Sequence, residues 1–210
     1  MAITAETLER YRTLSTPTVS DSLREVGLPP RGLDGIVSLD PAVKVVGVAF
    51  TVHCLPAAES ENDRIEYLGD ILPGSVVMVA NGGRTDCSVW GGQRTLAARQ
   101  RGAVGSVVDG AYRDVEEHAA FGYPVFGRAR AVAGSAGFAN PVASQVPVTL
   151  SGVEVVPGDL VLGDGSGVIV VPAAKVAEVL EAAEATAADE RRVAQAVAEG
   201  VDYFTAKKGP

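Results

Sequence analysis

The sequence contains little cysteine and little histidine, and these shortages exclude several kinds of site. The two cysteines, Cys54 and Cys87, lie far apart without Cys-x-x-Cys spacing, so the chain lacks the soft ligands of a structural zinc site. We expect both to be reduced, partly buried thiols. The two histidines, His53 and His118, lie in unrelated segments with no Ser-His-Asp or metal-binding spacing around them, so we expect structural roles for both.

Positive charge is also scarce, because 18 lysines and arginines stand against 26 aspartates and glutamates, which gives a formal net charge of −8. A nucleic-acid-binding surface or an anionic membrane requires basic clusters, so neither kind of partner is expected. The chain has no apolar run of the roughly 20 residues that a membrane span needs. Its first residues are charged and lack the apolar core of a signal peptide. We therefore expect a cytoplasmic protein.

Small and branched apolar residues are abundant, and 47% of the 210 residues are hydrophobic, which is enough for one domain with a buried core. Apolar residues at helical spacing predict N-terminal helices within residues 5–27. The same spacing predicts a long acidic helix over about 173–199. Near the start of the second predicted helix, Thr18 and Asp21 resemble a capping box.

The segments between these helices favour strands. β-branched runs predict buried strands over 43–52 and 75–80, and the polar stretch 60–70 predicts a short helix. Residues 128–145 are small and irregular in pattern, and the short strands expected after them are separated by Gly, Pro and Asp turn signals. The expected fold class is α/β, with a single domain over 1–210 that has a strand-helix-strand centre and a β-rich second half.

The segment that ends in Arg113 and Asp114 is the most informative part of the chain. A helix predicted over 93–101 is followed by a buried strand over 105–110, and the pair stands just after that strand. Open α/β sheets bind ligands at the carboxyl ends of their strands. Arginine offers a planar fork that matches a carboxylate, and aspartate is a hard oxygen ligand suited to Mg²⁺. The pair therefore suits a 2-oxo acid together with a divalent cation.

The same pair also has a purely structural interpretation. Asp114 is a good N-cap for a short helix over 115–120, and Glu117 stands where it would complete a capping box. Arg113 would then only bridge surface carboxylates. The residues alone leave both interpretations open.

Two glycines, Gly91 and Gly92, open the predicted helix. The free N–H groups and the dipole of a helix N-terminus favour an anion, and glycine leaves the approach unobstructed. Close packing of the helix on a strand is the alternative. No Gly-Lys-[Ser/Thr] follows, so this is not a P-loop. The glycine-rich segment 163–167 lies between two predicted strands, so we expect a hairpin turn there rather than a nucleotide-binding loop.

Several longer segments together are similar to the RraA-like family, which includes the 4-hydroxy-4-methyl-2-oxoglutarate / 4-carboxy-4-hydroxy-2-oxoadipate aldolases. These segments are GSVVMVANGG, VWGGQRTLAARQRGAVGSVVDGAYRDVEEHAAFGYPVF and VEVVPGDLVLGDGSGVIVVP. TPTVSDSL and VVGVAFTV also resemble family segments, so the resemblance extends over most of the chain. The order of the Trp-Gly, Asp-Gly-x-x-Arg-Asp, Pro-Val-Phe and Pro-Gly-Asp blocks is specific for the family, though not for one activity within it.

The resemblance implies a layered β/β/α, swivelling-domain-like fold, assembled as a homotrimer or as two stacked trimers with sites at subunit interfaces. It implies a divalent-metal-dependent lyase that cleaves a 4-hydroxy-2-oxo acid to pyruvate and also decarboxylates oxaloacetate. By matching position, Asp114 would hold Mg²⁺ or another divalent cation such as Mn²⁺, and Arg113 would contact the pyruvyl oxygens. The substrate carboxylate would be bound by backbone N–H groups at Gly91, Gly92, Gln93 and Arg94.

The chain departs from the family pattern at one position. The aldolases commonly carry an acidic residue twenty-one positions before the arginine, and here that position is Gly92. In the family that acid is associated with ordering the catalytic water, so another carboxylate would have to replace it. The sequence offers four candidates and does not choose among them: Glu116, Glu117, Glu199 and Asp202.

A non-catalytic role is the second hypothesis, because the family also contains an inhibitor of a ribonuclease E complex that acts by protein–protein contact. The acidic charge of the chain suits a basic partner. A third hypothesis is a metal-binding relative with an unlike substrate. The lyase hypothesis is favoured because the Arg113–Asp114 pair and the glycine-opened helix occur together.

Overall fold

The structure, a computed structural model, describes residues 3–208. Its helices are α1 (Ala5–Arg12), α2 (Thr16–Glu25), α3 (Gly92–Gln100), α4 (Val115–Ala120), α5 (Val176–Ala198) and α6 (Tyr203–Lys208). Its strands are β1 (Val37–Ser38), β2 (Val45–Pro56), β3 (Ser75–Ala80), β4 (Ser88–Trp90), β5 (Gly105–Tyr112), β6 (Val125–Arg130), β7 (Ala139–Ser144), β8 (Val148–Leu150), β9 (Val153–Val155), β10 (Leu160–Asp164) and β11 (Gly167–Val171). Short 3₁₀ turns lie at 57–59, 68–70 and 173–175.

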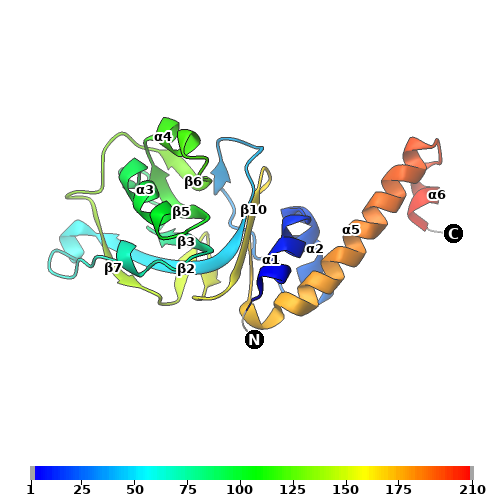
Figure 1. Ribbon diagram of the computed structural model, residues 1–210, viewed down its shortest axis with the longest axis horizontal. Coiled ribbons are helices and arrows are strands. Elements are labelled where there is room, and N and C mark those ends of the chain that lie inside the picture. The colour runs from blue at the N-terminus through cyan, green and yellow to red at the C-terminus, as the bar shows by residue number, and fades with distance from the viewer. Residues whose placement is uncertain (1–2, 209–210) are drawn as a thin grey trace.

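One mixed sheet organises the molecule, in the order β1-β6-β5-β3-β2-β10-β11 (Figure 1). The neighbours β2, β3, β5 and β6 run parallel, whereas β10 and β11 form an antiparallel hairpin on β2. The sheet curls until its two ends approach, since the Leu33 N–H donates to the Val168 carbonyl at 2.8 Å. This nearly closed α/β arrangement confirms the predicted fold class.

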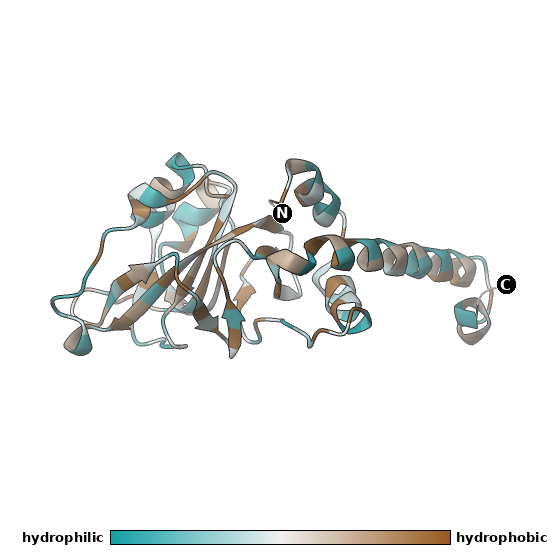
Figure 2. Ribbon diagram, turned by 90° about the horizontal axis from the view of Figure 1, so that it is seen from below, coloured by the Kyte–Doolittle hydropathy of each residue, from teal (hydrophilic) through white to brown (hydrophobic). Residues whose placement is uncertain are grey.

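Three apolar clusters hold the elements together. The first lies on the face of the sheet that α3 covers and includes Trp90. The second fills the inside of the curled sheet around Phe126. The third joins the sheet to α1, α2 and the first half of α5, where Val179 is fully buried. The central strands β3 and β5 are buried along their whole length and consist mostly of apolar residues, because both of their faces are covered (Figure 2).

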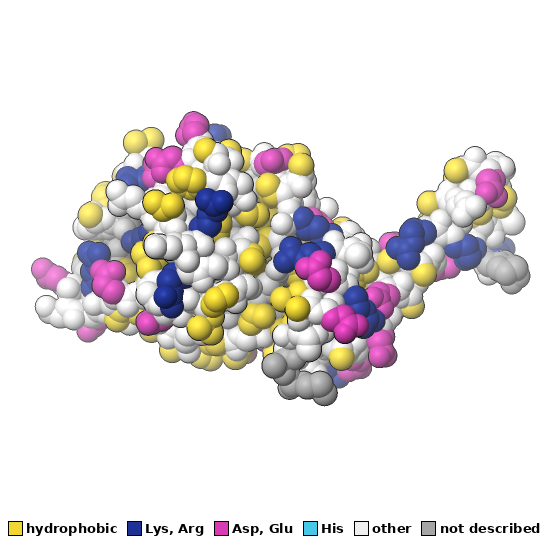
Figure 3. All heavy atoms as spheres, in the orientation of Figure 1, with side chains coloured by type: hydrophobic (Ala, Val, Ile, Leu, Met, Phe, Trp, Pro, Cys, Tyr) yellow, Lys and Arg dark blue, Asp and Glu magenta, His cyan; other side chains and the backbone are white. Residues whose placement is uncertain are grey.

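The outer part of α5 extends away from the rest of the protein and ends beside α6 (Figures 1 and 2). Ala187 is the last buried residue of α5, although the apolar stripe continues to Val197, which is 40% exposed. Acidic and basic side chains are interspersed over the face shown in Figure 3. Within residues 3–208, no helix combines the length and apolarity needed to cross a membrane. Cys54 and Cys87 are both buried and free.

Several local predictions are wrong. The second helix is capped by Ser15, whose hydroxyl accepts from the Thr18 N–H at 3.2 Å, so the capping box at Thr18 and Asp21 does not form. The helix starts earlier because proline is tolerated in a first turn. No α-helix forms over 60–70, since Ile65 instead donates its N–H to a β7 carbonyl. The irregular segment 128–145 contributes strand β7, which pairs with the second half of β2.

Candidate active site

The turn after β5 holds Arg113 and Asp114 in an unusual backbone conformation. Asp114 has φ 59° and ψ 46°, in the left-handed region, where aspartate and asparagine are the side chains best tolerated after glycine. The Arg113 N–H donates to the Trp90 carbonyl of β4 at 3.0 Å, which fixes the start of the turn. β4 runs parallel to β5 and leads directly into α3, so the turn lies beside the start of that helix.

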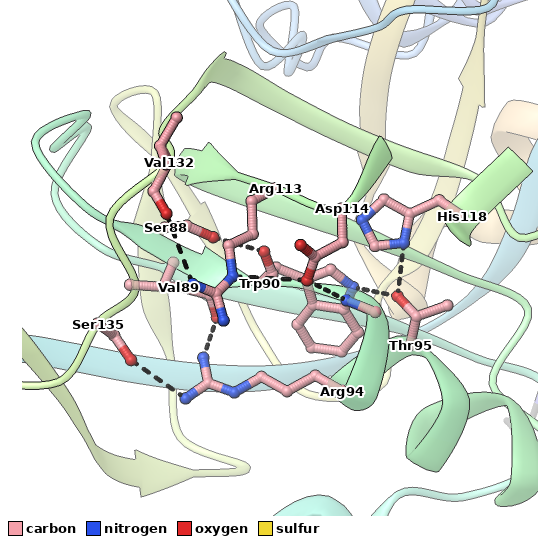
Figure 4. Close-up of polar contacts among 11 residues, drawn as sticks. Ser88, Val89, Trp90, Arg94, Thr95, Arg113, Asp114, His118, Val132 and Ser135 are labelled. Carbon is pink, nitrogen blue, oxygen red and sulfur yellow. Dashed lines mark hydrogen bonds and ion pairs between the residues drawn. The ribbon is translucent and has the colours of Figure 1, made fainter. Parts of the chain in front are cut away.

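The Asp114 carboxylate faces α3 and not its own helix. Its Oδ2 atom accepts the Gly92 N–H at 3.0 Å and lies 3.4 Å from Nε of Arg113 (Figure 4). It makes no capping hydrogen bond to α4, although Asp114 occupies the N-cap position. The capping-box interpretation of Asp114 and Glu117 is therefore wrong, and the left-handed backbone goes with a carboxylate placed at the α3 N-terminus.

Glu117 occupies the space that a side chain at position 92 would need. A Cβ atom added to Gly92 would stand 1.7 Å from Oε2 of Glu117 and 2.6 Å from its Cδ. Glu117 lines the pocket at the N-terminus of α3, whereas Glu116 is not among the lining residues of that pocket. Glu199 and Asp202 lie at the far end of α5, remote from α3 and α4 within this chain (Figure 1).

The first turn of α3 has backbone N–H groups that are available to bind a ligand. Gly91 is the N-cap and provides no side-chain acceptor, and the Thr95 N–H makes the first helical bond, to the Gly91 carbonyl at 3.0 Å. The Gly92 N–H is taken by Asp114, whereas the N–H groups of Gln93 and Arg94 have no partner among the hydrogen bonds of the described residues. Two N–H donors at the positive end of the helix thus remain for an anion.

The Arg94 side chain has a structural role that the sequence did not indicate. Its guanidinium donates to the Val89 carbonyl and, at 3.4 Å, to the hydroxyl of Ser135 (Figure 4). Ser135 lies in the loop between β6 and β7, so this bond holds the loop against α3. The same loop contacts the other arginine, because Arg113 donates to the Val132 carbonyl at 3.5 Å. Ser135 carries no sequence signal, since only tertiary folding brings its loop here.

These groups line one open pocket with a volume of about 310 Å³. Its lining residues are Gly91, Gln93, Arg94, Arg113, Asp114, Glu117 and Ser135. The side chains of Arg113 and Asp114 are 46% and 36% exposed, so a small molecule can reach both. Among residues 3–208 there is no group of three or more His, Cys, Asp or Glu side chains that could hold a metal ion. The pocket therefore offers at most two carboxylates to a cation.

An arginine, two carboxylates and a helix N-terminus thus meet in one small polar pocket at the strand ends of a curled α/β sheet. Residues 16–170 match the RraA-like family, described as Aldolase/RraA, and the chain belongs to that family. The family includes proteins named as aldolases and RraA proteins named as ribonuclease inhibitors.

Individual relatives agree with this membership. The chain is 30% identical over 204 residues to a Halalkalibacterium halodurans protein named "Putative 4-hydroxy-4-methyl-2-oxoglutarate aldolase", covering 92% of this chain and 90% of that protein. It is 31% identical over 196 residues to protein DlpA of Legionella pneumophila, which covers 92% of this chain but only 32% of DlpA. The chain therefore spans about a third of the length of DlpA.

Solved structures show the same fold. A crystal structure of a Pseudomonas syringae protein has a TM-score of 0.90 at 36% identity and covers 99% of both chains. The structure of Streptomyces coelicolor RraAS2, titled an unusual member of the RNase ES inhibitor RraA protein family, has a TM-score of 0.83 at 29% identity. It covers 90% of this chain and 96% of RraAS2.

Proposed function

We propose that the protein is a divalent-metal-dependent lyase that cleaves a 4-hydroxy-2-oxo acid to pyruvate and also decarboxylates oxaloacetate. One observation carries the proposal. The carboxylates of Asp114 and Glu117 and the guanidinium of Arg113 meet at the first turn of α3 in a single pocket. The name of the Halalkalibacterium halodurans relative supports the same reaction class.

The donor set fits Mg²⁺ or Mn²⁺. Mg²⁺ is usually held by one or two carboxylates and keeps several waters, so Asp114 and Glu117 suffice in a pocket with no third acid. When bound, such an ion would act as a Lewis acid on the 2-oxo group of the substrate. Zinc is disfavoured, because its sites use histidine and cysteine ligands that this pocket lacks.

The remaining donors fit the negative charge of the substrate. The N–H groups of Gln93 and Arg94 lie at the end of α3 that borders the pocket, where the helix dipole would stabilise a carboxylate. Arg113 would add a planar positive group beside the bound substrate. Cleavage leaves negative charge on the pyruvyl oxygens, and one well-placed donor of this kind contributes roughly 3–4 kcal/mol in the transition state.

Glu117 is assigned the role that the acid at position 92 has in the related aldolases. Its carboxylate stands over Gly92, beside Asp114, where it can accept a hydrogen bond from an ordered water. That water would relay the proton of the 4-hydroxyl group to the Glu117 carboxylate as the carbon–carbon bond breaks, and it would then deliver a proton to C3 of the pyruvate enolate to complete the cleavage. Gly92 therefore does not leave the pocket without its second carboxylate.

A regulatory role by protein contact is the second candidate function. The similarity to RraAS2 and the net charge of −8 favour it. A protein that only binds a partner, however, does not require two carboxylates and an arginine to meet at unpaired backbone N–H groups. We therefore rank the lyase first.

The direct test is pyruvate release from oxaloacetate and from 4-hydroxy-4-methyl-2-oxoglutarate, with Mg²⁺ and with excess chelator. We expect turnover that needs the metal and that falls at least about 100-fold in Asp114→Asn. Asparagine tolerates the left-handed backbone and can accept the Gly92 N–H, so the variant should fold normally. Asp70→Asn, on an exposed turn away from the pocket, is the matched control. Absence of turnover and of Mn²⁺ binding in the unaltered protein would overturn the proposal and favour the regulatory role.

A further inference from the structure

Three buried side chains lie behind the pocket in a hydrogen-bonded row. The Trp90 indole Nε1–H donates to Oγ1 of Thr95 at 2.8 Å, and Oγ1 of Thr95 lies 3.0 Å from Nδ1 of His118 (Figure 4). All three residues are at most 4% exposed, so water does not compete for these bonds. They come from three different elements: β4, α3 and α4.

The direction of each bond follows from the chemistry of the groups. An indole N–H can only donate, so the Thr95 oxygen accepts from Trp90 and its own proton is free to be donated to His118. The donated Thr95 proton requires an unprotonated nitrogen on the His118 ring. Nδ1 of His118 is then an acceptor, and the ring proton is on Nε2. This assignment leaves Nε2–H as a buried donor.

His118 lies beside the turn that carries the site (Figure 4). Its Nε2 atom is buried and has no hydrogen-bond partner among the described residues. The backbone N–H of His118 also donates to the Asp114 carbonyl, at 3.3 Å. The imidazole thus packs behind the left-handed turn whose carboxylate faces Gly92.

We propose that the hydrogen-bonded row Trp90–Thr95–His118 holds the turn at Arg113 and Asp114 in place against the first turn of α3. His118 and Thr95 are then positioning residues of the pocket. Thr95 lies one turn after Gly92 on α3, and His118 lies one turn after Asp114 on α4. Their hydrogen bond therefore ties together the two helices that carry the N–H donors and the carboxylates. The effect on metal binding rests on the proposed function, whereas the placement of the Asp114 carboxylate at Gly92 does not.

Thr95→Val tests the row, because it removes the hydroxyl and keeps the shape of the side chain. The first readout needs no metal: hydrogen exchange of the Gly92 amide, whose N–H donates to Asp114. We expect exchange at Gly92 to be at least about 10-fold faster in the variant. The second readout is the Mn²⁺ affinity, together with kcat and KM for pyruvate release. Loss of a residue that supports a metal ligand typically lowers metal affinity or activity by about 10–100-fold. The loss should appear in kcat and metal affinity more than in KM.

Two further variants separate positioning from general stability. Thr95→Ser keeps the hydroxyl and should restore both readouts. Ser106→Ala removes an equally buried hydroxyl, which is 2.9 Å from the Tyr123 hydroxyl and away from the turn, and should change neither. Wild-type Gly92 exchange and Mn²⁺ affinity in a folded Thr95→Val protein would overturn the inference. Faster Gly92 exchange in a protein that binds no Mn²⁺ would support the row and count against only the lyase proposal.

Discussion

At the scale of single residues, Gly92 decides what the pocket contains. It has no Cβ, and the space is taken by the Glu117 carboxylate. The Gly92 N–H also donates to Oδ2 of Asp114 at 3.0 Å, which holds that carboxylate in place. One small residue thus allows two acidic side chains to approach the same helix end, where the partial positive charge of the helix offsets part of their repulsion.

Gly92→Ala should therefore weaken metal binding and turnover and largely spare the fold. The added methyl would displace the flexible end of Glu117, while alanine is a better helix former than glycine. We expect the free energy of unfolding to change by less than about 1 kcal/mol, and Mn²⁺ affinity and pyruvate release to fall about 10–100-fold. Binding titrations and denaturant unfolding would measure the two effects.

Gly69→Ala is the control for that variant, because a Cβ at Gly69 meets nothing within 4 Å. It should leave metal affinity and turnover unchanged. If Gly92→Ala also kept its full metal affinity, the assignment of Glu117 as the second carboxylate would be wrong.

At the scale of elements, the two halves of α5 have different surroundings. Its first half buries an apolar stripe against α2 and the sheet, and its second half extends past them into solvent (Figure 1). The periodic pattern of apolar residues is the same in both halves. The pattern therefore predicts a helix but does not predict which of its residues are covered.

Val179 and Val197 make a matched comparison within α5, because they are the same residue type at 0% and 40% exposure. Val179→Ala removes buried methyl groups and should lower the free energy of unfolding by about 2 kcal/mol. Val197→Ala should stay within about 0.5 kcal/mol of the unaltered protein. Chemical denaturation of both variants gives the comparison, and equal losses would contradict the placement of Val197 outside the core.

At the scale of the whole molecule, several large apolar side chains on loops and on α3 are exposed. Leu72 is 57% exposed, Leu96 53% and Val132 95%, and Val132 borders the Arg113 side of the pocket. The resemblance to the family implies subunit contacts near the sites. We propose that the protein assembles as a homotrimer or as two stacked trimers, which would cover part of this surface.

Sedimentation velocity at several protein concentrations tests this proposal. The expected species has three or six times the mass of one chain. A single species with the mass of one chain across the concentration range would contradict it.

Much of the chain's local structure could be predicted from the sequence. β-branched runs and helical spacing located β2, β3, β5 and α5, because local periodicity reflects which faces are buried. The ends of elements were harder. Ser15 and not Thr18 caps α2, and β7 was missed because its small, mixed residues become a strand only by pairing with β2.

At the site, the position of Arg113 and Asp114 after a buried strand and the glycines at the start of a helix could be predicted, since these are local features of the chain. Two outcomes could be learned from the folded chain alone. Asp114 faces Gly92 and does not cap α4. Glu117 fills the space at position 92, while Glu199 and Asp202 lie far away. The physical reason is distance along the chain. Which side chains meet depends on how β4, α3 and α4 pack on β5, and no local pattern records that packing.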